Sequence, residues 1–290
     1  MSDERLIRRV AVLGAGTMGH GIAQVAAMNG YGVTLFDIDF VAAENGLQKI
    51  RKNLEKGVQL GKVADATRET ALAALRTSTD LAEAVGEVDL VIEAAPESME
   101  LKKRIFTDVE AHAPTEAILA SNTSSLSIGE IADQLAHPAR FLGLHFFNPV
   151  HLMQLVEVVH GPRTDGEVLD AAIRWVERLD REPIVVKDSP GFASSRLGVV
   201  LGLEAMRMVE EGVASPEDID RAMELGYRHP MGPLKLTDLV GLDVRLGIAR
   251  YLHATLGSEA FRPPEILERM VAEGRTGKKA GSGFYDWGEG

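Results

Sequence analysis

The pattern of apolar and polar positions changes character at about residue 188. Before that point, short β-branched runs alternate with longer amphipathic stretches, which predicts parallel strands joined by crossover helices. Beyond it, long amphipathic segments follow one another without a strand-like run. The predicted strands span 9–13, 32–37, 89–93, 117–121, 140–145, 153–159 and 183–187, and the predicted helices span 18–29, 40–60, 98–112, 192–212, 216–226, 232–256 and 263–273.

This change predicts an α/β protein with two domains. Residues 1–188 are expected to form a doubly wound α/β domain of the Rossmann type. Residues 189–290 are expected to form an all-helical domain for substrate binding and dimerisation, and Pro190-Gly191 marks the boundary as a turn and helix-start signal. Because a helical domain with several apolar faces often pairs with a copy of itself, we expect a homodimer.

Composition narrows the class of protein. The 290 residues are 45% hydrophobic and 26% charged, as in an ordinary globular protein. The absence of cysteine excludes disulfides, thiolate nucleophiles and Cys-based metal sites, so we expect a bound redox cofactor. No metal site is expected. The net charge of −12 opposes binding to nucleic acid or to an anionic membrane. With no membrane-spanning run and no secretory-type start, the sequence predicts a soluble cytoplasmic protein.

A glycine-rich turn follows the first predicted strand and opens the first predicted helix. Its sequence is Gly14-Ala15-Gly16-Thr17-Met18-Gly19. The first glycine permits the tight turn, the second lets a pyrophosphate approach the backbone, and the third lets helix and strand pack closely. The helix N-terminus supplies N–H groups and partial positive charge to the phosphates. The turn therefore predicts a dinucleotide site.

Asp37 ends the second predicted strand, near the position about 20 residues on where a ribose-binding acid lies in such sites. A carboxylate there accepts hydrogen bonds from the ribose hydroxyls and repels a 2′-phosphate, and Ile38-Asp39 offer no arginine to hold one. We therefore expect NAD rather than NADP. A glycine turn without a ligand is the alternative, which the order of strand, turn, helix, strand and acid disfavours.

Oxidation of an alcohol by NAD needs a general base for the hydroxyl proton and donors for the substrate oxygen. His145 ends one predicted strand, and Glu157 lies inside the next, where a buried acid demands a partner. If the two strands pair around Asn148-Pro149, Glu157 can orient the imidazole and stabilise its protonated form. A structural histidine and an acid bonded to the backbone remain the alternative.

Hydroxyl and amide donors follow another predicted strand, in Asn122-Thr123-Ser124-Ser125. Ligands of open α/β sheets bind at the carboxyl ends of the strands, so we expect this cluster near the substrate. Ser124 or Ser125 also suits the N-cap of a helix that begins near Ile128, and the two roles are compatible.

With these residues in view, the chain resembles the L-3-hydroxyacyl-CoA dehydrogenase family, which includes stand-alone 3-hydroxybutyryl-CoA dehydrogenases. The resemblance covers nearly the whole chain. It rests on Gly-Ala-Gly-Thr-Met-Gly at 14–19, Ala-Ser-Asn-Thr-Ser-Ser-Leu at 120–126, Gly-Leu-His-Phe-Phe-Asn-Pro at 143–149, Leu-Val-Glu-Val at 155–158, Pro-Gly-Phe at 190–192, His-Pro-Met-Gly-Pro at 229–233 and Gly-Lys-Lys-Ala-Gly-Ser-Gly-Phe-Tyr at 277–285.

The resemblance implies reversible, NAD-dependent oxidation of a short-chain (S)-3-hydroxyacyl-CoA, such as 3-hydroxybutyryl-CoA, to 3-oxoacyl-CoA in fatty-acid metabolism, including β-oxidation. It implies that His145 is the general base and Glu157 its partner. Ser124 and Asn122 would contact substrate oxygens. Four further residues would lie near the cofactor: Glu97, Lys102, Asn148 and Lys279.

One position departs from the family pattern, because Ser195 stands where the family usually has Asn after Pro-Gly-Phe. Serine still donates a hydrogen bond but has a shorter reach, so acyl positioning is expected to differ. For the CoA phosphates we expect Lys49, Lys52 and Lys56, which share a helix face near Asn53. A solvated charged face is the alternative.

Two other functions remain open. One is an NAD-dependent dehydrogenase with the same two-domain fold that acts on a sugar acid or a free hydroxy acid. The other is a catalytically idle NAD-binding protein. Phe146-Phe147 beside the expected base and the lysine-bearing helix face favour an acyl-CoA over a free acid, and the combination of His145, Glu157 and Ser124 disfavours an idle protein.

Overall fold

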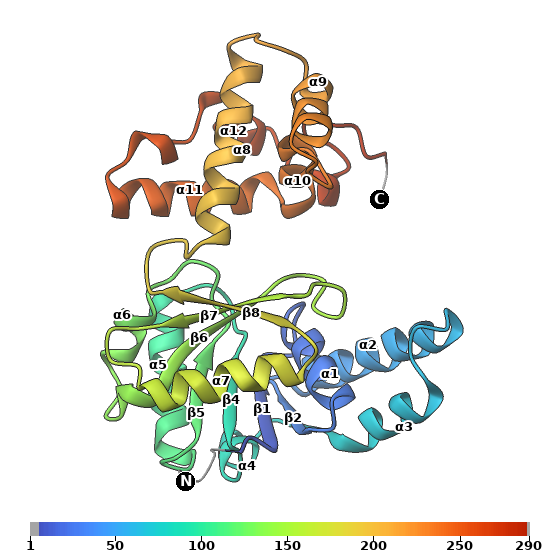
Figure 1. Ribbon diagram of the computed structural model, residues 1–290, viewed down its shortest axis with the longest axis vertical. Helices are drawn as coiled ribbons and strands as arrows, with labels where there is room; N and C mark the ends of the chain where they lie inside the picture. Colours follow the sequence, from blue (N-terminus) through green and yellow to red (C-terminus); the bar gives the residue numbers. More distant parts are fainter. Residues whose placement is uncertain (1–5, 289–290) are drawn as a thin grey trace. The chain divides into compact units, whose positions relative to one another are not determined.

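The computed structural model describes residues 6–288, and the chain divides into two compact units between Ser189 and Pro190 (Figure 1). This division lies one residue beyond the expected boundary. The N-terminal unit contains a doubly wound sheet and the C-terminal unit is helical, so the predicted fold class is confirmed.

The N-terminal unit is built on one eight-stranded sheet with the order β3-β2-β1-β4-β5-β6-β7-β8. All neighbouring strands run parallel except β6 and β7, which form an antiparallel pair. The general expectation of parallel strands is therefore wrong for this pair. The strands are β1 Arg9–Leu13, β2 Gly32–Phe36, β3 Leu75–Ser78, β4 Leu90–Glu93, β5 Ile118–Ser121, β6 Phe141–Phe146, β7 Leu155–His160 and β8 Glu182–Lys187.

Helices cover both faces of this sheet, as Figure 1 shows. Because strand side chains alternate between faces, Val10 and Val12 share a core with α1, α2 and α7, which includes the buried Trp175. On the other face, Phe106 of α5 lies edge-on to Phe141 of β6, with ring centroids 4.6 Å apart. The helices are α1 Gly19–Met28, α2 Phe40–Gln59, α3 Asp65–Ala74, α4 Leu81–Val85, α5 Met99–His112, α6 Ile128–Ala132 and α7 Gly166–Arg178.

The C-terminal unit packs helices around an apolar core that includes Leu203, Met206 and Leu234. The single helix expected over 232–256 is instead two helices, because the chain breaks at Gly241, whose φ is 105°. Between residues 190 and 288 the structure contains no β-strand. The helices are α8 Ser194–Glu210, α9 Pro216–Arg221 with a π-helical turn Ala222–Gly226, α10 Pro233–Val240, α11 Leu242–Leu256 and α12 Glu265–Ala272.

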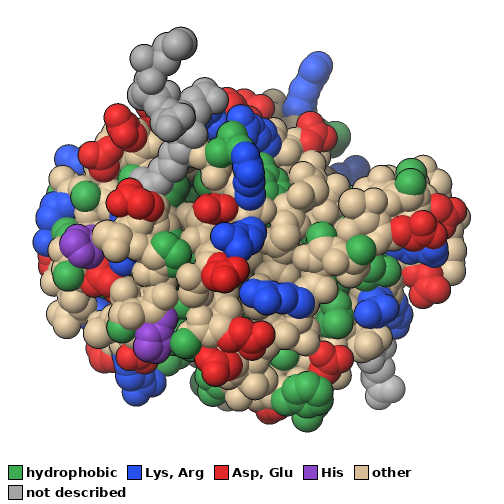
Figure 2. Space-filling model, turned by 90° about the horizontal axis from the view of Figure 1, so that it is seen from below, with side chains coloured by type: hydrophobic (Ala, Val, Ile, Leu, Met, Phe, Trp, Pro, Cys, Tyr) green, Lys and Arg blue, Asp and Glu red, His purple; other side chains and the backbone are tan. Residues whose placement is uncertain are grey.

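Charged side chains of both signs intermix on the face shown in Figure 2. The chain carries 43 acidic and 31 basic residues, so its overall field is negative. An anionic ligand must therefore be held by local donors and a few placed cations rather than by a broad basic surface. None of the described helices combines the length and the apolar character that crossing a membrane requires.

Two buried aspartates anchor the loops of the C-terminal unit. Asp220 accepts hydrogen bonds from the amides of Leu234 and Lys235 at 2.8 Å, and its Oδ2 also accepts from the Tyr285 hydroxyl at 2.8 Å. Burial and that hydrogen bond raise the pKa of Tyr285 above its usual value. Each carboxylate oxygen is satisfied, so this acid fixes the start of α10.

Asp238 anchors the final motif of the chain in the same way. It is 1% exposed, and its Oδ1 accepts from the amide of Phe284 at 3.0 Å. Its Oδ2 accepts from the amide of Tyr285 at 2.9 Å and from the indole of Trp287 at 2.8 Å. A Cβ added at Gly283 would lie 2.2 Å from Asp238 Oδ1, which explains the glycine in this motif.

Replacing Asp238 by asparagine is expected to lower the free energy of unfolding by about 3 kcal/mol, because the amide turns a donor toward a buried N–H and loses the charge. Urea unfolding followed by tryptophan fluorescence measures this. The matched control is Asp286→Asn, since exposed Asp286 accepts only from the amide of Gly288. We expect the control to change stability by less than about 0.5 kcal/mol. Equal losses in the two variants would contradict the anchoring role.

Candidate functional site

The glycine-rich turn lies at the topological switch point of the sheet. The chain moves from β1 to β2 and β3 on one side and returns to β4 on the other, so a crevice opens beyond the carboxyl ends of β1 and β4. Gly14 has a φ of 97°, and a Cβ added at Gly19 would lie 1.7 Å from the Gly14 oxygen. The first and third glycines are thus required by the backbone itself.

A cavity of about 870 Å³ opens at this crevice. An added Cβ at Gly16, which lines the cavity, meets no atom within 4 Å, so the backbone there is accessible to a ligand. The N-terminus of α1 at Gly19 supplies backbone donors for phosphates. The residues therefore fit the pyrophosphate of a dinucleotide.

Asp37 lines the same cavity and also holds the turn. Its Oδ2 accepts from the amide of Ala15 at 2.9 Å and its Oδ1 from the amide of Asp39 at 3.2 Å. The sequence predicted the acid but not its bond to the turn. The sequence analysis did not identify the other residues that line the cavity, which lie on α5 and in the segments before it. They are Thr79, Leu81, Ala94, Ala95, Pro96, Leu101, Arg104, Ile105 and Asp108.

His145 and Glu157 meet across the antiparallel pair, where they are direct partners in the β6–β7 register. His145 Nδ1 lies 2.6 Å from Glu157 Oε2. Glu157 is fully buried, and His145 is 7% exposed. The hydrogen bond expected from the sequence is present. Because Nδ1 carries the proton that faces the carboxylate, Nε2 is the ring nitrogen with a lone pair for proton transfer. The Phe147 ring lies 4.4 Å from the imidazole, between ring centroids.

Asn122 ties the end of β5 to the end of β6. Its Oδ1 accepts from the amide of Phe146 at 2.9 Å, so the amide side chain lies beside the residue that follows His145. Its own backbone amide donates to the Glu93 carbonyl at 2.8 Å. The structure therefore brings Asn122 to the same edge of the sheet as His145.

Glu97 organises the donor cluster after β5. Its Oε1 accepts from the Thr123 hydroxyl at 2.6 Å, the Ser124 amide at 3.0 Å and the Ser124 hydroxyl at 3.2 Å. The Ser125 hydroxyl donates to the same oxygen at 3.4 Å. The N-cap of α6 is Ser127, whose hydroxyl accepts from the Glu130 amide, so the expected cap by Ser124 or Ser125 is wrong.

Lys102 lies beneath this cluster rather than on the surface. Its side chain is 1% exposed, and its ammonium donates to Glu93 Oε1 at 2.7 Å and lies 3.5 Å from Glu97 Oε2. Glu93 Oε2 accepts from the Ser121 hydroxyl at 2.6 Å. Lys102 thus interacts with two carboxylates at once, Glu93 directly and Glu97 at longer range, and links β4 to the donor cluster.

Basic side chains gather where the loop after β6 meets α1 and α2. Burial and then the charges of His20, Arg181 and Lys56 hold the pKa of His151 below its usual value. Asn53, one turn before Lys56, donates to Gln24 at 3.2 Å. Lys49 and Lys52 are exposed on the same helix. The lysine face predicted from the sequence is therefore part of a larger basic group.

The remaining predicted residues are spread over both units. Asn148 is exposed in the loop after β6, and its peptide bond to Pro149 is cis. Ser195 lies in the first turn of α8. Lys279 donates to Asp243 at 2.6 Å. Burial alone would raise the pKa of Asp243. The hydrogen bonds from Lys279 and from the Val244 amide outweigh burial, so the pKa of Asp243 lies below its usual value.

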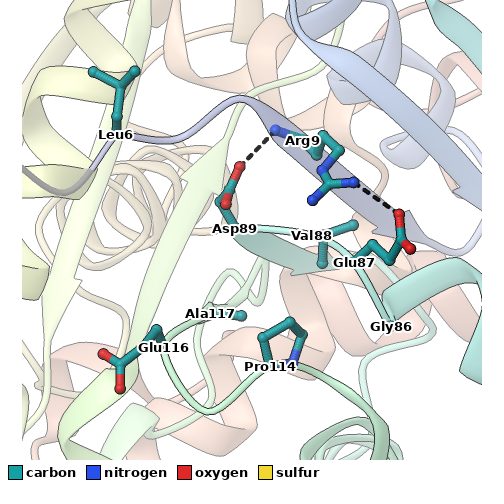
Figure 3. Close-up of a pocket in the computed structure, with 9 residues that line it drawn as sticks. All are labelled: Leu6, Arg9, Gly86, Glu87, Val88, Asp89, Pro114, Glu116 and Ala117. Atoms are coloured by element: carbon teal, nitrogen blue, oxygen red, sulfur yellow. Dashed lines mark hydrogen bonds and ion pairs between the residues drawn. The ribbon is translucent and has the colours of Figure 1, made fainter.

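A second cavity, of about 460 Å³, lies at the opposite edge of the sheet, where β1, β4 and β5 begin. Figure 3 shows Arg9 between two acids there: its amide donates to Asp89 at 2.9 Å and its guanidinium to Glu87 at 2.8 Å. Arg9 offsets only one of the acidic charges that line this cavity, so the cavity does not suit an anionic cofactor, and ligands of such sheets bind at the carboxyl edge. The cavity at the glycine turn is the better candidate for the cofactor.

Comparison with known proteins gives the same family for both units. The family description "3-hydroxyacyl-CoA dehydrogenase, NAD binding domain" matches residues 9–189, and "3-hydroxyacyl-CoA dehydrogenase, C-terminal domain" matches residues 191–287. The chain is 40% identical to 3-hydroxybutyryl-CoA dehydrogenase of Bradyrhizobium diazoefficiens, over 97% of this chain and 96% of that protein. It is 42% identical to the mitochondrial hydroxyacyl-coenzyme A dehydrogenase of Sus scrofa, over 97% and 92%.

A solved structure has the same architecture. The crystal structure of (S)-3-hydroxybutyryl-CoA dehydrogenase from Ralstonia eutropha aligns with a TM-score of 0.94 and 39% identity, covering 98% of this chain and 100% of that one. Family descriptions that match both units, and relatives aligned over nearly their full length, agree with the glycine turn and the buried His145–Glu157 pair. The chain belongs to the 3-hydroxyacyl-CoA dehydrogenase family.

Proposed function

We propose that the protein catalyses the reversible, NAD-dependent oxidation of (S)-3-hydroxyacyl-CoA to 3-oxoacyl-CoA, with a preference for short acyl chains such as 3-hydroxybutyryl-CoA. The observation that carries the proposal is the 2.6 Å hydrogen bond between buried Glu157 and His145, in a chain of this family. A fully buried acid bonded to one ring nitrogen fixes the orientation of the imidazole and leaves the other ring nitrogen for proton transfer.

His145 acts as the general base in this proposal. Its Nε2 takes the proton of the substrate 3-hydroxyl while Nδ1 donates to Glu157. The negative carboxylate stabilises the imidazolium that forms, and the same imidazolium returns the proton in the reverse reaction. NAD, when bound, would supply the acceptor for the hydride that leaves C3.

Ser124 and Asn122 hold the substrate oxygens. The Ser124 hydroxyl donates to Glu97 in the structure, and a rotation of this hydroxyl lets it donate to the substrate 3-oxygen instead, as hydroxyl or as ketone. Asn122 accepts from Phe146, which directs its NH₂ group away from that contact. Glu97, Asn148 and Lys279 are proposed to bind the nicotinamide half of the cofactor, with Lys102 positioning Glu97.

The basic group around Lys56 is the proposed site for the CoA phosphates. Arg181 and Lys56 both act on His151, so a bound phosphate would meet two cations at once. Asn53 adds a hydrogen-bonding side chain on the same helix. Ser195, at the usual Asn position, is proposed to contact the acyl group. A role in β-oxidation and a cytoplasmic location stay predictions from the sequence.

The direct test is turnover of acetoacetyl-CoA and longer 3-oxoacyl-CoA thioesters with NADH and with NADPH. We expect the highest kcat/KM for the four-carbon substrate and a clear preference for NADH, because Asp37 repels a 2′-phosphate. Reduction of a free 3-oxo acid in the absence of any thioester turnover would instead favour the free-acid dehydrogenase.

Replacing His145 by glutamine is expected to lower kcat by about 10²- to 10⁴-fold, because the variant lacks the general base. Glu157→Gln keeps an acceptor for the imidazole but removes the charge, so we expect a smaller loss of about 10- to 100-fold. Stopped-flow and steady-state assays with acetoacetyl-CoA measure both. The control is His137→Gln, at an exposed histidine of the same unit. Undiminished turnover in His145→Gln would overturn the assignment of the base.

The glycine turn offers a test that separates cofactor contact from folding. Gly19→Ala places a Cβ 1.7 Å from the Gly14 oxygen and is expected to lower both Tm and NADH affinity. Gly16→Ala meets no protein atom within 4 Å, so it is expected to leave Tm unchanged while weakening NADH by about 10-fold or more. Fluorescence titration and thermal denaturation give the two readouts. Normal NADH affinity in Gly16→Ala would show that the pyrophosphate lies elsewhere.

A homodimer is proposed on the apolar surface of the C-terminal unit. Leu236, Leu239 and Val240 of α10 and Val244 of α11 are each 40% to 44% exposed, which suits burial against a second copy. Val240→Glu with Val244→Glu is expected to shift sedimentation velocity from dimer to monomer. The control Val213→Glu changes an equally large exposed valine outside this surface. A monomeric wild type, or a dimer that persists in the double variant, would contradict the assignment.

A further inference from the structure

Glu97 follows directly on the loop that borders the cofactor cavity. This loop begins after Glu93, the last residue of β4, and consists of Ala94, Ala95 and Pro96. All three of its residues line the cavity of about 870 Å³ at the glycine turn. The side chain of Glu97 is 38% exposed, whereas Glu93 is fully buried. Of the two acids at the ends of this loop, Glu97 is therefore the one that a ligand can reach.

The order of the strands places one half of the cofactor beside Glu97. Asp37 follows β2 and the glycine turn follows β1, so the adenosine ribose and the pyrophosphate are expected at these two strand ends. β4 and β5 come next in the sheet, and then β6 with His145. Because the hydride acceptor must lie close to the substrate carbon beside the base, the nicotinamide is expected over the ends of β4 and β5. Glu97 accepts hydrogen bonds from Thr123 and Ser124, just after β5, and so borders that position.

The charges around Glu97 do not balance. The Lys102 ammonium donates to Glu93 Oε1 at 2.7 Å and lies 3.5 Å from Glu97 Oε2. Among residues 6–288, Lys102 is the only cation within 4 Å of either carboxylate. One positive charge therefore faces two negative charges. Since Lys102 and Glu93 are both inaccessible, the excess negative charge is exposed to a ligand at Glu97.

The contacts of Glu97 suit a carboxylate and not a carboxylic acid. Its Oε1 accepts from the Thr123 hydroxyl at 2.6 Å, from the Ser124 amide at 3.0 Å and from two further hydroxyls. Its Oε2 faces the Lys102 ammonium. An ionised carboxylate only accepts hydrogen bonds, whereas a carboxylic acid must also donate one. Both oxygens of Glu97 face donors, so the side chain is negative where the nicotinamide is expected.

We propose that the charge of Glu97 stabilises the oxidised nicotinamide of NAD⁺ relative to the reduced ring of NADH, and so shifts the redox equilibrium of the bound cofactor toward NAD⁺. The inference rests on the proposed function, in which Glu97 contacts the nicotinamide half. The ring is positively charged in NAD⁺ and neutral in NADH, so a nearby anion stabilises only one of the two redox states.

This charge also acts on the direction of the reaction. During oxidation of the alcohol, C3 gives a hydride with both electrons to the ring, and His145 Nε2 takes the hydroxyl proton. One positive charge is thus lost from the ring while one is gained by the imidazole. Glu157 stabilises the imidazolium, whereas Glu97 stabilises the ring before the transfer, so the two carboxylates act in opposite directions. Bound NADH is therefore a stronger hydride donor toward a 3-oxoacyl substrate than it would be without Glu97.

The test compares the affinities of NAD⁺ and NADH, measured by isothermal titration calorimetry without substrate. We expect Glu97→Gln to weaken NAD⁺ about 10-fold more than NADH, because the variant keeps the shape and loses the charge. Such a change in the ratio of affinities corresponds to about 30 mV in the potential of the bound two-electron couple. Glu97→Asp keeps the charge, so both affinities are expected to fall by a similar factor.

The matched control is Glu100→Gln, which removes the same charge from an exposed residue in the first turn of α5. Glu100 accepts from the Ser98 hydroxyl at 3.2 Å, and we expect its loss to change the ratio of affinities by less than about 2-fold. Glu93→Gln leaves the Lys102 charge to Glu97 and is expected to change the ratio in the same direction as Glu97→Gln.

The outcomes separate the charge of Glu97 from its hydrogen bonds to the loop after β5. Equal losses of NAD⁺ and NADH affinity in Glu97→Gln, or a larger loss for NADH, would show that the residue only holds this loop. Either result would overturn the inference and leave the proposed function intact. A wild-type protein that binds neither NAD⁺ nor NADH would contradict the proposed function and the inference together.

Discussion

The hydrogen bond between Glu157 and His145 is the constraint on which the candidate site depends. A fully buried carboxylate in the middle of β7 is tolerable only where a donor faces it, and the β6–β7 register provides His145 as its direct partner. A slip of one residue would turn Glu157 to the opposite face and leave it unpaired. The chemistry of the pair and the register of this antiparallel pairing are therefore specified by the same two residues.

The same face of the sheet carries a continuous set of polar groups toward the carboxyl edge. Glu93 opposes Ser121 in the register, and Ser121 opposes Gly143, two residues before His145. Each of the first two is satisfied, since Glu93 accepts from Ser121 and from Lys102. An added Cβ at Gly143 would lie 2.9 Å from Ile128 Cδ1 and 3.0 Å from Val159 Cβ, so a larger residue would force these side chains to shift. Buried polar contacts thus hold the ends of β4 and β5 together beneath the loops of the candidate site.

The sequence predicted what depends on local order. The glycine turn, the acid after β2 and the neighbouring strands of His145 and Glu157 all follow from spacing and alternation. What it missed depends on distant contacts. β3 is a short edge strand with a single buried residue, Ser78, and therefore has no apolar run to reveal it. The break at Gly241 lies inside an otherwise helical pattern. Lys102 reads as an ordinary charged helix residue until the fold buries it against Glu93.

The C-terminal unit shows how burial separates structural charges from available ones. Asp220 and Asp238 are nearly inaccessible, and each accepts three hydrogen bonds from the loops that it anchors, so both carboxylates are satisfied within the unit. Arg245 is buried to a similar degree and, among residues 6–288, has no such partner.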